Sequence, residues 1–232
     1  MKIFLGDNEE AAVLAAAEDL QSDIRNVCEA NIPIASYPGY KDHPGFVICT
    51  IGRGDEPLVR EKYKLDTSYL QGKYESFVIE KCGDTIIVVG SDTLGTVYGI
   101  YEICQTLLGV DPLQFWTEIA PAKGKLEDVF AQAEFPIRFG PPAVRLRGWF
   151  VNQDDLIRQF DYGSRKWDCD VAGVQRNIKS AYIVPNPEIF ECLAETLLRL
   201  KQNLLLAGTY VCPRDTLWKA IMAMAARRGL YN

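Results

Sequence analysis

The sequence has a single histidine, His43, and its seven cysteines include no Cys-x-x-Cys pair. Because structural and catalytic metal sites are built mainly from histidine and cysteine at short spacings, no metal is expected, and no cofactor motif was found. The odd number of scattered cysteines is typical of reduced, mostly buried thiols rather than of a disulfide framework. We interpret His43 as an exposed loop residue, since there is no second histidine to act as a co-ligand.

Long apolar runs and an excess of basic charge are also missing. No segment reaches the roughly 18 apolar residues of a membrane span, and Met1 to Asp7 is too short for a signal-peptide core, so we expect no membrane contact. The chain as written is expected to be cytoplasmic unless a leader was removed. The net charge of −6 and the pI near 5.0 argue against nucleic acid as a partner, because phosphate binding needs a concentrated basic face.

The apolar pattern that is present predicts an α/β protein. At 232 residues the chain is long enough for two domains. Asp7 or Asn8 is expected to cap the first helix, and Gly109 to end a later one. The strands predicted in the first half are 2–6, the fully buried 46–51, and a hairpin of 74–79 with 85–89.

The stretch VVGSDTLGTVYGIYE, residues 88–102, runs from a strand through a glycine into a helix. Such a loop either cradles a phosphate or packs a helix onto a sheet. Asp92 stands at the capping position, where its carboxylate would repel a phosphate, and the stretch contains no lysine or arginine. Gly95 and Gly99 fall on one helical face and allow a close approach to a sheet. We therefore favour packing.

The expected organisation is a small N-terminal α/β domain over residues 1–120, with a mixed sheet and packed helices, then a linker over 121–143. Residues 144–232 are predicted to hold successive parallel βα units. The elements expected there are a strand at 144–151, a helix at 186–201, a strand at 203–209, a helix at 214–228 and the start of a third strand at 229–231.

Three segments together resemble glycoside hydrolase family 115, the xylan α-glucuronidase-like enzymes. They are residues 88–102 with the DPLQFW that follows, RLRGWFVNQDDL at 145–156, and LLRLKQNLLLAGTYV at 197–211 with ARRGLYN at 226–232. Gln153 departs from the family pattern, in which an acidic residue follows the asparagine. The resemblance implies an N-terminal α/β domain followed by the first units of a catalytic (β/α) barrel. It also implies a carbohydrate partner and, in the intact enzyme, metal-free hydrolysis of glucuronosyl side chains.

A closed (β/α)₈ barrel needs about 200 residues or more, and 144–232 is less than half of that. We therefore expect an incomplete barrel with an uncovered edge. The chain would be a fragment, a truncated relative, or a protein completed by a homo-oligomer or by a missing C-terminal part. Alone, it is expected to be nearly inactive.

The candidate substrate-binding residues are Asn152, Asp154, Asp155 and Trp149. The first three follow the first barrel strand, at the end where such enzymes build their sites. Alternatively, the two aspartates turn the following loop, and Trp149 belongs to the core, which is the more frequent use of a strand tryptophan. The acid and base of a glycosidase pair are not identified.

Three other interpretations remain open. Arg145 and Arg147 suit a uronic acid carboxylate, but a salt bridge between the two domains is the favoured use. The chain as a whole could be a noncatalytic carbohydrate-binding or assembly module. It could also be a nucleotide-binding α/β protein, which the absence of basic residues around Gly90 disfavours.

Overall fold

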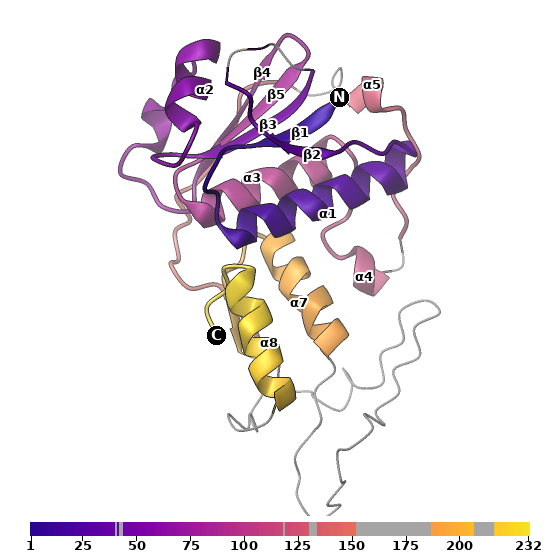
Figure 1. The fold of residues 1–232 in the computed structure, drawn as a ribbon. Helices are drawn as coiled ribbons and strands as arrows, with labels where there is room; N and C mark the ends of the chain where they lie inside the picture. Colours follow the sequence, from indigo (N-terminus) through magenta and orange to yellow (C-terminus); the bar gives the residue numbers. More distant parts are fainter. Residues whose placement is uncertain (40, 42–43, 118, 130–133, 152–186, 207–215) are drawn as a thin grey trace, which may run out of the picture. The chain divides into compact units, whose positions relative to one another are not determined.

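The computed structural model describes residues 1–39, 41, 44–117, 119–129, 134–151, 187–206 and 216–232 (Figure 1). These residues form two compact units, Met1–Arg145 and Leu146–Asn232. Each unit is described by itself below. His43 lies outside the described residues.

A mixed six-stranded sheet forms the centre of the first unit, as the sequence predicted. The strand order is β2-β1-β3-β5-β4-β6. The first four strands in that order are mutually parallel, whereas β4 pairs antiparallel with both β5 and β6. The strands are β1 (Lys2–Leu5), β2 (Ile34–Ser36), β3 (Gly45–Thr50), β4 (Phe77–Cys82), β5 (Thr85–Gly90) and β6 (Ile137–Phe139).

Helices cover both faces of this sheet. The two longest, α1 (Ala11–Cys28) and α3 (Thr93–Thr106), lie side by side on one face (Figure 1). The opposite face is covered by α2 (Glu56–Tyr63) and the 3₁₀ turn η1 (Ser68–Leu70). Two short helices, α4 (Gln114–Thr117) and α5 (Leu126–Val129), complete the unit.

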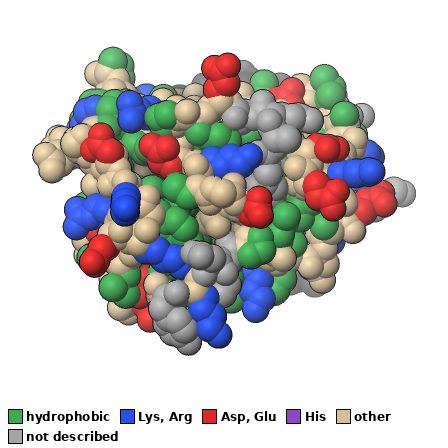
Figure 2. Space-filling model, turned by 90° about the horizontal axis from the view of Figure 1, so that it is seen from above, with side chains coloured by type: hydrophobic (Ala, Val, Ile, Leu, Met, Phe, Trp, Pro, Cys, Tyr) green, Lys and Arg blue, Asp and Glu red, His purple; other side chains and the backbone are tan. Residues whose placement is uncertain are grey.

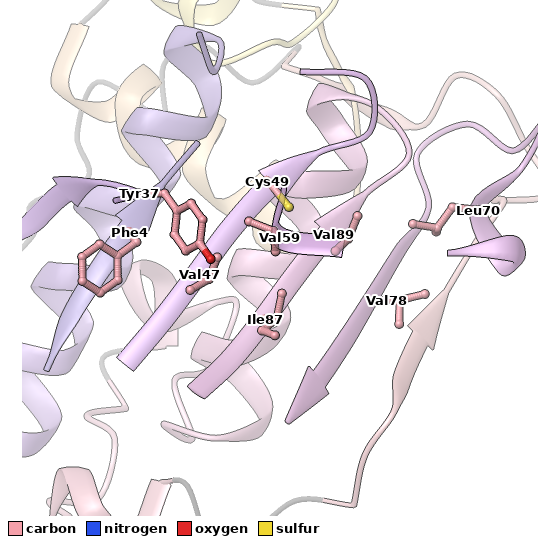
Figure 3. Packing of buried hydrophobic residues seen from close by; sticks show 9 residues of the cluster. All are labelled: Phe4, Tyr37, Val47, Cys49, Val59, Leu70, Val78, Ile87 and Val89. Carbon is pink, nitrogen blue, oxygen red and sulfur yellow. The ribbon is translucent and has the colours of Figure 1, made fainter. Parts of the chain in front are cut away.

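The central strands are buried on both sides because their apolar residues are continuous rather than alternating. Every residue of β3 and of β5 is buried. Figure 3 shows the cluster on the α2 side, which contains Phe4, Tyr37, Val47, Cys49, Val59, Leu70, Val78, Ile87 and Val89. Each fully buried large apolar side chain contributes about 1.5–3 kcal/mol, so this two-sided core fixes the sheet.

The predicted cap of the first helix is wrong. The helix begins at Ala11 with Glu10 at the N-cap position, and no side chain caps it. Asn8 instead adopts a left-handed conformation with φ of 63°, and the Asp7 N–H donates to Asp55 Oδ2 at 3.1 Å. These residues therefore belong to the strand-to-helix loop, which tertiary contacts hold in place.

The segment expected as a linker, 121–143, contributes a strand to the sheet. β6 pairs with β4 through Phe77↔Phe139 and Ile79↔Ile137. The rings of Phe77 and Phe139 stack with centroids 5.5 Å apart. Because these aromatic and β-branched residues find partners across the strands, a proline-rich stretch becomes an edge strand.

The second unit contains the predicted order of parallel elements. β7 (Gly148–Phe150) pairs in parallel with β8 (Leu204–Leu206). The helices α7 (Pro187–Arg199) and α8 (Thr216–Arg227) contact each other, and the rings of Phe190 and Trp218 meet edge to face. Tyr231 forms an isolated parallel bridge with Leu204, which is how a third strand begins.

Candidate functional site

The β5–α3 junction, which contains the stretch 88–102, is a packing device. Asp92 caps α3: its Oδ1 accepts from the Gly95 N–H and its Oδ2 from the Glu75 N–H, both at 2.8 Å. A Cβ on Gly95 would lie 2.2 Å from the Ser76 carbonyl oxygen, and one on Gly99 2.6 Å from Val88 Cγ1. The carboxylate thus takes the place at the helix start that an anion would need. The packing interpretation is confirmed.

A polar chain that the sequence analysis missed lies at the carboxyl ends of β3 and β1. The Glu9 carboxylate accepts from the Thr50 N–H and from the Thr50 hydroxyl, each at 2.7 Å. Thr50 Oγ1 is in turn 2.7 Å from Thr96 Oγ1 on α3. Burial raises the pKa of the Glu9 carboxyl, and the hydrogen bonds from Thr50 oppose this. In the sequence, the feature that could have indicated this chain is Thr50, a polar residue at the end of an otherwise apolar strand.

The β1–α1 loop and the β3–α2 loop contact each other at this edge of the sheet. Arg53 pairs with Glu10 at 2.7 Å and donates to the Asn8 carbonyl oxygen. A Cβ on Gly54 would lie 1.9 Å from the Asp7 carbonyl oxygen. β1 has β2 on one side and β3 on the other, so this is the switch point where open α/β sheets usually bind ligands. Here, acidic side chains and tight backbone contacts occupy that position.

The second unit has one covered and one uncovered sheet face. Trp149 and Leu205 are in register and share a face, and Leu205 is 1% exposed. Phe150 and Leu206 are paired on the opposite face, where they are 54% and 43% exposed. The ladder continues to Val151, whose N–H donates to the Leu206 carbonyl oxygen at 2.9 Å. Val151 lies on the same side as Trp149 and is buried, so Phe150 and Leu206 are the residues that make the other face apolar at the carboxyl ends of the strands.

Of the four candidate substrate-binding residues, the structure describes only Trp149. That residue is half-buried and lies on the same face as the buried Leu205. Asn152, Asp154 and Asp155 lie outside the described residues. Their sequence positions follow the end of β7 directly.

Arg147 stands at the other end of β7 from the expected site. Its Nε and Nη2 donate to the Lys201 carbonyl oxygen at 3.0 and 2.8 Å. Because Arg147 precedes the amino end of the strand, its guanidinium is not placed at the carboxyl edge where a substrate was expected. Arg145 is exposed.

Thiols and charged groups elsewhere do not suggest another catalytic centre. Burial raises the pKa of the Cys49 thiol well above its ordinary value, and that of Cys28 and Cys82 to a smaller degree, which disfavours the reactive thiolate. Within the described ranges, no three His, Cys, Asp or Glu side chains are grouped to hold a metal ion.

Charged side chains of both signs are interspersed on the face drawn in Figure 2, where the described basic residues do not gather into one area. On that face, the described residues therefore do not form the concentrated basic surface that a polyanion would need. Among the helices that the structure describes, none combines the length and the apolar character needed to cross a bilayer.

Taken together, the elements define a mixed α/β unit and a parallel βα unit within one chain, and solved glycoside hydrolases share this arrangement. One similar structure is a family GH115 4-O-methyl-α-glucuronidase, BtGH115A, with specificity for decorated arabinogalactans. The identity is 24%, the TM-score is 0.75, and the match covers 99% of this chain and 28% of that one. The resemblance inferred from the sequence is therefore confirmed at the level of the fold.

A second similar structure is a GH138 enzyme targeting pectin rhamnogalacturonan II, with 14% identity and a TM-score of 0.51. The match covers 99% of this chain and 24% of that one. The chain thus spans about a quarter of the length of these two enzymes. No family model matches the chain, and no curated protein does.

Proposed function

We propose that this chain is the N-terminal portion of a glycoside hydrolase resembling the xylan α-glucuronidases. The observation that supports this most directly is the fold match to the GH115 enzyme, which extends over 99% of the chain and so includes both units. In the intact enzyme the reaction would be hydrolysis of glucuronosyl side chains on a plant polysaccharide. In this proposal the first unit, Met1–Arg145, is the α/β domain that precedes the barrel, and the second unit, Leu146–Asn232, begins the catalytic barrel.

The second unit has the features expected of the first barrel segments. In a (β/α)₈ barrel the helices cover the outer face of the strands, and large apolar side chains fill the interior. Leu205 is buried, whereas Phe150 and Leu206 on the other face are half exposed. We assign this second face to the barrel interior, to be covered by further βα units of the same polypeptide. The alternative is that a second copy of the chain covers this face.

We assign a substrate-binding role to Asn152, Asp154 and Asp155. Trp149 shares the covered face with Leu205, opposite the proposed barrel interior, and this favours the alternative in which it belongs to the core. Glycosidases use two carboxyl groups about 5–9.5 Å apart, and adjacent aspartates on an extended chain point in opposite directions. Asp154 and Asp155 are therefore not assigned as the catalytic pair. One of them, with Asn152, would hold sugar hydroxyls at the carboxyl edge of β7.

Saccharide titration tests this proposal. The purified chain is titrated with glucuronic-acid-substituted xylo-oligosaccharides and arabinogalactan fragments, while product release from an aryl α-glucuronide is followed. We expect binding without turnover, and at least about tenfold weaker binding in Asn152→Ala and Asp155→Asn; each hydrogen bond to a sugar contributes on the order of 1 kcal/mol or more. Asp128→Asn, at an exposed position in α5, is the matched control.

Two results would count against the proposal. Turnover by the chain at a kcat of about 1 to 10³ per second would show a complete active site. Failure of every probe to bind would remove the substrate-binding role.

The nucleotide-binding alternative gains no support from the geometry. The Asp92 carboxylate already accepts the Gly95 N–H at the start of α3, and the Glu9 carboxylate accepts the N–H and the hydroxyl of Thr50 at the end of β3. A nucleotide-induced rise in melting temperature would revive that alternative.

A further inference from the structure

Arg147 connects three segments of the second unit at the amino ends of its strands. Its N–H donates to Asn203 Oδ1 at 2.9 Å, and its carbonyl oxygen accepts from the N–H groups of Asn203 and Leu204. The Asn203 carbonyl oxygen then accepts from the Tyr231 N–H at 2.7 Å. One arginine and one asparagine thus bring together the start of β7, the start of β8 and the C-terminal segment.

The guanidinium fixes the turn that follows α7. α7 ends at Arg199, and the chain turns through Lys201, which has a left-handed φ of 57°. The main-chain N–H groups of this turn bond the last carbonyl groups of the helix, as at many helix C-termini. Two guanidinium N–H groups of Arg147 donate to the Lys201 carbonyl oxygen just beyond the helix. The turn that leads into β8 is therefore fixed to the residue that leads into β7.

Gly148 independently restricts how β7 can pair with β8. A Cβ at this position would lie 1.7 Å from the Leu204 carbonyl oxygen. The strands can approach this closely only where a glycine faces Leu204, and Gly148 is paired with that residue. Sliding β7 by one residue would bring an Arg147 or Trp149 side chain to that position and would turn its alternating residues to the opposite faces.

We infer that Arg147 is a positioning residue that sets the register of β7 against β8. With Asn203 and Gly148 it forms a clamp at the amino ends of β7 and β8. Because the clamp fixes which residues of the two strands are paired, it also fixes where the carboxyl end of β7 lies relative to that of β8. That the carboxyl ends of the strands bind a substrate rests on the proposed function. The role of Arg147 in strand pairing does not depend on it. Arg147, considered from the sequence for a uronic acid carboxylate or for a salt bridge between the domains, has a structural role within the second unit in this assignment.

Native-state amide hydrogen exchange tests the clamp. In Arg147→Ala we expect at least tenfold faster exchange at the Val151 and Leu205 amides, which donate to Leu206 and Tyr231. The helical amides of α7 and those of the first unit should change much less. Arg147→Lys, which keeps one donor group, should restore part of the protection, and Arg145→Ala is the matched control at an exposed position.

The outcomes separate this inference from the proposed function. Unchanged exchange at Val151 and Leu205 overturns the clamp, as does an equal increase at every amide of the second unit, which would mean that Arg147 adds only general stability. Saccharide titration of the same variants, at a temperature where they remain folded, should show at least tenfold weaker binding by Arg147→Ala. If the unmodified chain binds no saccharide, the proposed function fails, and the exchange result still decides the clamp.

Discussion

At the scale of single residues, Glu9 shows how an ordinary acidic side chain acquires a structural role. Its carboxylate is the acceptor for two donors on Thr50, and Thr50 continues the contact to Thr96. Both threonines are buried, at 2% and 0% exposure. The β1–α1 loop is thereby attached to the sheet and to α3 through one carboxyl group.

The protonation of Glu9 should make stability depend on pH. Burial raises its pKa above the ordinary value of 4.5. A carboxyl group whose pKa rises on folding favours the folded state below its ordinary pKa, and this contribution is lost as the pH rises through the raised value. Glu9→Gln cannot ionise, yet its amide can accept from the Thr50 N–H and donate to the hydroxyl.

We therefore expect the unfolding free energy of the unmodified chain, relative to Glu9→Gln, to fall as the pH rises from the ordinary pKa of 4.5 through the raised value. Urea denaturation at several pH values measures this difference. Glu127→Gln, at an exposed position, is the control. A difference that stays constant, or that grows in favour of the unmodified chain at higher pH, would contradict the assignment.

At the scale of elements, the contact between α3 and the sheet depends on glycine. Gly95 faces main-chain atoms of Ser76, which cannot move aside as a flexible side chain would. Gly95→Ala is expected to lower the unfolding free energy by about 1–3 kcal/mol or more, because the added methyl overpacks a closed interface.

Gly124→Ala is the matched control, since a Cβ at that position has nothing within 4 Å and the backbone does not require a glycine. Chemical denaturation of both variants measures the effect. Equal stability of the two would show that the helix can shift away from the sheet at little cost.

Charged side chains also contribute to the α7–α8 pair. Arg228, which follows α8, donates to Glu191 of α7 at 2.5 Å. Within α7, Arg199 donates to Glu195 at 2.8 Å. The side chains of Arg199 and Arg228 are 3% and 7% exposed, so removing a carboxylate partner is expected to destabilise this unit; the cost is about 3–5 kcal/mol in fully buried pairs.

At the scale of the whole molecule, the chain divides into two compact units, Met1–Arg145 and Leu146–Asn232. We expect two unfolding transitions, with Gly95→Ala lowering the midpoint of one and Glu195→Ala lowering that of the other. Calorimetry of the two variants and of their combination checks this, since effects on independent units add. A single transition that both substitutions shift together would mean that the units unfold as one.

Much of the fold could be predicted from periodicity. The continuous apolar run at β3 predicted a strand buried on both faces, and the glycines of α3 predicted close packing. The cap of α1 could not be predicted, because Asp7 and Asn8 are good caps locally and their contacts with the β3–α2 loop come from a distant part of the chain. β6 was missed for the same reason, since its partner β4 is far away in the sequence.

For the candidate site, too, local features could be predicted from the sequence and long-range contacts could not. Asn152, Asp154 and Asp155 were chosen because they follow a strand, which is a local property. Arg147 was considered for a uronic acid because of its chemistry, whereas its partners Lys201 and Asn203 lie more than 50 positions away. Proximity between such residues exists only after the strands have paired, so no spacing in the sequence reveals it.

By itself, the sequence determined the central strands and the long helices, the burial of β3 and β5, and the packing role of the helix that contains Gly95, because these depend on neighbours within a turn or two of the chain. Tertiary structure alone decided that the Glu9 carboxylate attaches the β1–α1 loop to the end of β3 and that Arg147 fixes the register of β7 and β8. The physical reason is that a hydrogen bond is directional and short, and only the folded chain brings such distant donors and acceptors within about 3 Å.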